Sequence, residues 1–163
     1  MCRAWSTAQT LPVSVFGTEP YLKLSGIAIV LAEVLESSNR PNESYETYSA
    51  ALAQLRAAQE QAPLSGRERM RAVALAHKLG EMAETQQRDP EEAEHFLTFA
   101  VEEVLRVLKD QAGKGKGKEE GGEDGETVTM LAELDLPWWV SKVDVAAPLE
   151  ALGKFYARED KPQ

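Results

Sequence analysis

The segment HKLGEMAETQQRDPEEAEHFLTFA, from His77 to Ala100, decides the fold. Leu79, the first residue of its leucine-glycine pair, lies 11 residues before Pro90, and polar residues fill the interval just before the proline. This order predicts a helix, a short turn and a second helix. Proline fits the first position of that second helix because its missing N–H would have no intrahelical partner there.

The same arrangement occurs twice more. Leu31 lies 10 residues before Pro41, and Leu152 lies 10 residues before Pro162. A small residue follows each of the three leucines: Ala32, Gly80 and Gly153. Glycine inside a helix costs ~1 kcal/mol relative to alanine, which indicates that a paired helix approaches closely. We therefore expect Gly80→Leu to overpack the contact, and Gly80→Ala to be mild or stabilising. Small, large and small residues follow the first two prolines: Ser44, Tyr48 and Ala51, then Ala93, Leu97 and Ala100.

The chain is predicted to be all-α, with helices over 25–37, 41–61, 66–87, 90–110 and 144–158. Ser65 and Glu68 have the spacing of a capping box, and Asp89 is expected to cap the helix that starts at Pro90. We expect a disordered N-terminal segment over 1–24 and two helical repeats over 25–110. A disordered Gly/Lys/Glu-rich insert is expected over 111–126, where six glycines leave little to bury. Residues 127–163 then hold a connecting segment and the first helix of a truncated third repeat.

Composition excludes several classes of protein. Hydrophobic residues make up 43 % and aromatic residues 7 % of the chain, a mixture that favours helices over strands. The net charge of −9 argues against a nucleic-acid partner, because phosphates attract the opposite sign. Cys2 is the only cysteine, so neither an internal disulfide nor a multi-cysteine metal site forms. No apolar run reaches the ~20 residues of a membrane-spanning helix, so the chain itself is expected to be soluble.

The repeated residues resemble the tetratricopeptide repeat. That family has a Leu-Gly or Leu-Ala pair, a bulky residue three positions on, and a second helix with a small–bulky–small face. Leu31-Ala32-Leu35 matches this pattern, whereas Ala83 stands where a bulky residue is usual; Leu152-Gly153 with Tyr156 opens a third copy. The resemblance implies a tetratricopeptide-like stack of antiparallel helical hairpins, or α-solenoid.

Longer phrases are similar to one group of such proteins: RMRAVA at 69–74, KLGEMA at 78–83, AVEEVL at 100–105, LPWWVSK at 136–142 and APLEALG at 147–153. They resemble a fungal mitochondrial adaptor of the inner-membrane i-AAA protease. The resemblance implies a non-enzymatic protein without a cofactor, at the inner membrane on the intermembrane-space side. It would present unfolded proteins to a membrane AAA protease and bind protein or extended peptide, with no small-molecule substrate. A structural assembly factor of a mitochondrial membrane complex and a chaperone-tail receptor stay open as alternatives.

The resemblance also implies a partner-binding groove along the first helix of each repeat. Its positions in this chain are Ile29, Glu33 and Glu36, then His77, Glu81 and Glu84, then Glu150, Lys154 and Arg158. Four carboxylates in the first two repeats would make that end of the groove acidic and suited to basic peptides. A solvent-exposed helix face explains the same carboxylates equally well. Chaperone-binding arrays carry Lys and Asn where Glu33 and Glu81 stand, although Lys154 keeps that alternative open.

No catalytic or metal site is predicted. His77 and His95 lie 18 residues apart with no neighbouring cysteine. Arg67, Arg69 and Arg71 are expected to form a solvated helix surface. The pair Trp138-Trp139 is expected to anchor a chain segment against neighbouring helices, with an exposed peptide-binding role as the alternative.

Overall fold

The computed structural model describes residues 2–115 and 136–159, which form helices and no strand. The elements are α1 (Cys2–Thr10), the short 3-10 helix η1 (Val13–Phe16), α2 (Pro20–Ser37), α3 (Pro41–Gln61), α4 (Gly66–Thr85), α5 (Pro90–Gly115) and α6 (Lys142–Glu159). The prediction of an all-α chain is confirmed. None of the described helices is long and apolar enough to cross a membrane.

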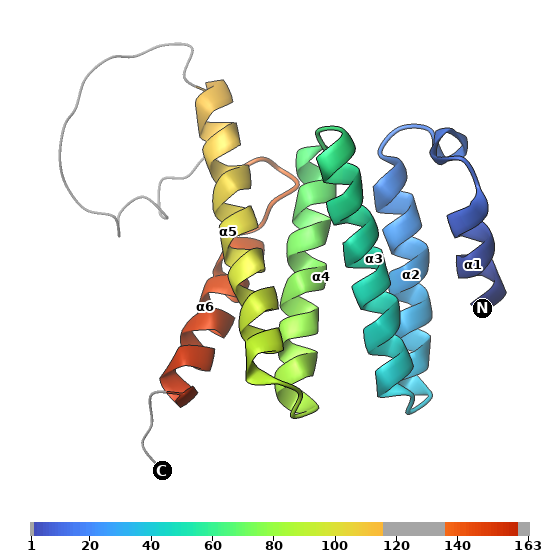
Figure 1. The fold of residues 1–163 in the computed structure, drawn as a ribbon. Helices are drawn as coiled ribbons and strands as arrows, with labels where there is room; N and C mark the ends of the chain where they lie inside the picture. The colour runs from blue at the N-terminus through green and yellow to red at the C-terminus, as the bar shows by residue number, and fades with distance from the viewer. Residues whose placement is uncertain (1, 116–135, 160–163) are drawn as a thin grey trace.

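The helices pack as a row of hairpins (Figure 1). Helices α2 and α3 form one hairpin and α4 and α5 the next, while α3 packs against α4 and joins the two. Helix α6 packs against both α5 and α4, and α2 also touches α4. Helix α4 therefore contacts both α2, the first helix of the preceding hairpin, and α6, the helix that follows its own hairpin.

The two hairpin turns have the same hydrogen bonds. In the first turn, the Arg40 N–H donates to the carbonyl of Leu35, and Asn39 has a left-handed φ of 57°. In the second, the Arg88 N–H donates to the carbonyl of Ala83, and Gln87 has a φ of 52°. Both are helix C-caps of the Schellman type, with one left-handed residue. The internal repeat seen in the sequence is thus also a repeat of backbone structure.

Local capping chemistry sets the helix starts. Ser65 and Glu68 form the predicted capping box at the start of α4. Asp89 accepts the Glu91 N–H at 3.1 Å, as expected of the cap before Pro90. A third cap was not predicted: Ser141 and Asp144 exchange side-chain and backbone hydrogen bonds at the start of α6, which places that start at Lys142.

The predicted close approach of paired helices is confirmed in the second hairpin. A Cβ atom on Gly80 would lie 2.6 Å from Cδ2 of Leu97, which is fully buried. The expectation that Gly80→Ala is mild did not account for this contact, since the added carbon would have to displace Leu97. At Gly153, nothing lies within 4 Å of such a Cβ atom.

The N-terminal segment differs from the expectation of disorder over 1–24. It contains α1, η1 and the first turn of α2. Trp5 and Ala8 of α1 are buried, and α1 packs against α2, so the burial of these side chains holds the short helix in place. Helix α5 continues to Gly115, into the expected insert. The rest of that insert, the connecting residues up to 135 and the expected helix start at Pro162 lie outside the described residues.

Candidate protein-binding groove

A cavity of about 480 Å³ lies between α4 and α6, with Leu22 of α2 at one edge. Apolar side chains from α4, from the residues before α6 and from α6 itself contribute to its lining, among them Met70, Trp138, Val143 and Pro148. Trp138 is 89 % exposed and Val143 is 71 % exposed, whereas Pro148 is buried. The cavity is thus an open groove with a partly solvated apolar lining.

The two tryptophans have different roles. Trp139 lies over the start of α4, where a Cβ atom on Gly66 would come 2.5 Å from its ring. It is partly buried and packs against the core, so it anchors the segment before α6, as expected for the pair. Trp138 instead extends its ring into solvent beside the groove. Since Trp139 anchors the chain, the backbone of Trp138 is held beside the groove.

Basic side chains line the same groove. Arg67 pairs with Glu19 at 2.8 Å, and His77 Nε2 lies 3.8 Å from Glu81 Oε1. Arg71 lines the cavity and makes no hydrogen bond or ion pair with any other described residue. The unpaired guanidinium of Arg71 places a positive charge beside the apolar surface at this end of the groove.

The predicted groove residues of the first repeat lie outside this cavity. Ile29 is half-buried against the core, and Glu33 is exposed. Glu36 accepts hydrogen bonds from Lys78 and Ser44, each at 3.2 Å. Lys78 lies in α4, the first helix of the second hairpin, so Glu36 links α2 to α4.

In the other two repeats, His77 alone lines the cavity between α4 and α6. Glu84 pairs with Arg158 at 3.0 Å, which links α4 to α6 as Glu36 links α2 to α4. Glu150 and Lys154 form an exposed pair at 2.6 Å, and the hydrogen bond from the lysine lowers the pKa of the carboxyl.

Two of the four predicted acidic groove residues are thus bound to cations of the neighbouring helix. Glu33 stays exposed, and so does Glu81, apart from its contact with His77. Arg71 and Glu81 are ten residues apart on α4, about 15 Å along the helix axis. The face formed by the first helices therefore carries positive charge at one end and negative charge at the other.

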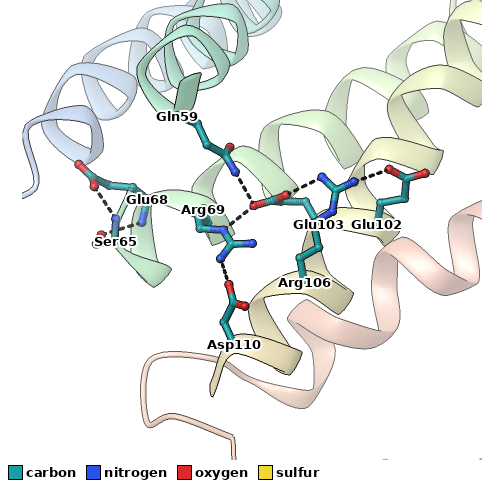
Figure 2. Close-up of polar contacts among 8 residues, drawn as sticks. All are labelled: Gln59, Ser65, Glu68, Arg69, Glu102, Glu103, Arg106 and Asp110. Carbon is teal, nitrogen blue, oxygen red and sulfur yellow. Dashed lines mark hydrogen bonds and ion pairs between the residues drawn. The ribbon is translucent and has the colours of Figure 1, made fainter. Parts of the chain in front are cut away.

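A buried charge network holds α3, α4 and α5 in register (Figure 2). Glu103 is fully buried; its Oε1 accepts from Arg69 Nε at 2.6 Å and from Gln59 Nε2 at 3.2 Å. Arg69 also pairs with Asp110, and Arg106 lies 3.5 Å from the second Glu103 oxygen. The expectation of a solvated arginine surface is wrong for Arg69, because its partner lies on another helix.

Two charged side chains that line the groove are already paired. Asp144 caps α6 and Arg67 pairs with Glu19, so these two titratable groups already have partners. Among the described residues, no group of three or more His, Cys, Asp or Glu side chains is placed to hold a metal ion. In comparisons with known proteins, no family model, no curated protein and no solved structure matches the chain.

Proposed function

We propose that this chain is a non-enzymatic protein-binding module that holds an extended polypeptide in the groove between α4 and α6. The observation that carries the proposal is the exposed indole of Trp138, which lines the same open and partly apolar cavity as the unpaired Arg71. Tryptophan, arginine and methionine are enriched where proteins bind one another, and exposed apolar patches mark such sites.

The charge distribution supports an extended occupant. A polypeptide that follows α4 from Arg71 toward Glu81 would place its acidic residues near Arg71 and its basic residues near Glu81. Apolar side chains between them would contact Met70 and Val143, which line the groove near its positive end. This pattern of mixed charges and apolar residues is typical of unfolded segments of ordinary globular proteins.

The partner follows from the resemblance to mitochondrial protease adaptors. We propose that the bound segments are unfolded proteins destined for an inner-membrane AAA protease. A structural assembly factor of a membrane complex is the second candidate, because the inter-repeat pairs Glu36–Lys78 and Glu84–Arg158 would suit a rigid scaffold. Affinity purification separates the two: protease subunits support the adaptor, and subunits of a respiratory complex support the assembly factor.

The groove itself is tested by site-specific cross-linking. A photo-reactive phenylalanine derivative at Val143 places the probe in the groove, and the same residue at Leu105 of α5 is the matched control. Both positions are exposed, and Leu105 does not line the cavity. We expect an unfolded polypeptide to cross-link at position 143 and not at 105. Equal yields at both positions would contradict the proposal.

A further inference from the structure

Helix α6 exposes a face whose counterpart in the corresponding helix α4 is buried. Leu79 and Leu152 occupy the same place in their repeats, so residues 73 positions apart correspond. In α4, the four residues of this face are all buried: Val73, Ala76, Gly80 and Ala83. Their counterparts in α6 are more open: Ala146 and Gly153 are exposed, Leu149 is half-buried and Tyr156 is 43 % exposed.

The two glycines show the difference most clearly. A Cβ atom on Gly80 would meet Leu97 of α5 at 2.6 Å, so a leucine fills the space beside that glycine. Nothing described lies within 4 Å of a Cβ atom on Gly153. Among the residues that the structure describes, none fills in α6 the space that Leu97 fills in α4.

Small and large residues alternate along this face, so that an antiparallel copy of the same face would set large residues against small ones. Ala146 and Tyr156 are both five residues from position 151, and Leu149 and Gly153 are both two residues from it. In an antiparallel pair of α6 helices centred on that position, Leu149 meets Gly153 of the other copy, and Tyr156 meets Ala146. Each contact of a large residue with a small one then occurs twice, as a two-fold axis requires.

Tyr156 is already oriented for such a contact. Its hydroxyl donates to Oε1 of Glu94 in α5 at 2.5 Å, and its ring packs edge-on against Phe155. The polar end of the side chain therefore has a partner, while the ring keeps 43 % exposure. An aromatic ring held in this way contributes contact area at little entropic cost.

We propose that a second copy of this chain docks antiparallel on the face of α6 formed by Ala146, Leu149, Gly153 and Tyr156. One helix pair buries less than the roughly 1,200 Å² of a standard interface, so the dimer is weak and concentration-dependent. Each copy carries a net charge of −9, so salt screens the repulsion between copies and strengthens the dimer.

Sedimentation equilibrium of the full chain, from low to high micromolar concentration, measures the association. The parent is expected to shift from monomer toward dimer, and more so at higher salt. Gly153→Leu fills the receiving space in both copies and is expected to leave a monomer. Gly26→Leu is the matched control, because it adds the same side chain to open space on α2 and should dimerise like the parent. Circular dichroism checks that both variants stay helical.

Disulfide trapping tests the orientation. One chain with Leu149→Cys is mixed with another with Gly153→Cys, both in a Cys2→Ser background. The antiparallel dimer is expected to give the mixed disulfide between positions 149 and 153 in preference to either homodimer. A parent that stays monomeric, a dimer that Gly153→Leu leaves intact, or a preference for 149–149 disulfides would each overturn the proposal.

Discussion

The carboxylate of Glu68 caps two helices that belong to different hairpins. Its Oε1 accepts the backbone N–H of Tyr21 in α2 at 3.1 Å, and its Oε2 accepts the N–H of Ser65 at the start of its own helix at 3.0 Å. The side chain is buried, so neither N–H has water as a ready replacement partner. One residue thus fixes the start of α4 and ties it to the start of α2.

Replacement of this residue tests the link between the two hairpins. Glu68→Ala removes both acceptors, and a lost cap or an unsatisfied buried donor each costs about 1–3 kcal/mol. We expect a fall of about 2–4 kcal/mol in the free energy of unfolding, measured by urea denaturation. Glu43→Ala, which removes an exposed glutamate from the first turn of α3, is the control and should change stability little. Equal effects of the two variants would refute the double cap.

The contact of Gly80 with Leu97 gives a second prediction. Gly80→Ala should destabilise the protein by about 1–3 kcal/mol, because the new carbon displaces a fully buried leucine. Gly26→Ala, at a helical glycine with open space around it, should stabilise the protein by about 0.5–1 kcal/mol. Thermal unfolding of both variants measures the contrast. If the two melting temperatures shift in the same direction, Gly80 is not the point of closest helix contact.

The buried network around Glu103 gives a third prediction. Arg69→Met leaves a buried carboxylate with fewer partners, and a broken buried ion pair costs about 3–5 kcal/mol. The double variant Arg69→Met/Glu103→Leu removes both charges and should recover much of that loss. Chemical denaturation of Arg69→Met, Glu103→Leu and the double variant completes a double-mutant cycle with the parent. Additive losses in the double variant would show that the two side chains do not depend on one another.

Much of this structure was predictable because it rests on local chemistry. The capping box of Ser65 and Glu68 and the Asp89 cap before Pro90 involve residues close in sequence, so spacing alone identified them. The Arg69–Glu103 pair was missed because its partners are 34 residues apart and meet only through packing. Helix α1 was missed because it is short and depends on the burial of Trp5 against α2.

The candidate groove was only partly predictable for the same reason. Spacing identified Glu36 and Glu84 as equivalent, but not that each pairs with a cation of the next helix. The cavity between α4 and α6 is instead lined by Arg71 and Trp138. The pair Trp138-Trp139 was recognisable in the sequence, but the sequence did not predict that Trp139 is anchored and Trp138 exposed.

The acidic end of the face formed by the first helices gives a fourth prediction. With Glu36 and Glu84 already paired, Glu33 and Glu81 are the carboxylates left to attract a basic peptide. An extended basic peptide should bind more tightly than an acidic one of equal length, and salt should weaken binding, since charges are screened beyond about 8 Å. The double variant Glu33→Lys/Glu81→Lys should reverse the preference without loss of helicity. If it binds both peptides as the parent does, these carboxylates are only a solvated face.

The central claim is that the groove beside Trp138 holds unfolded polypeptide, and one titration tests it directly. A fluorescently labelled, reduced and alkylated protein that cannot refold is titrated with the parent, Trp138→Ala and Leu105→Ala. Both residues are exposed, so neither change should disturb the fold. We predict that Trp138→Ala weakens binding at least about tenfold, as loss of an interface hot spot does, while Leu105→Ala binds like the parent. Equal affinity of all three proteins would contradict the account.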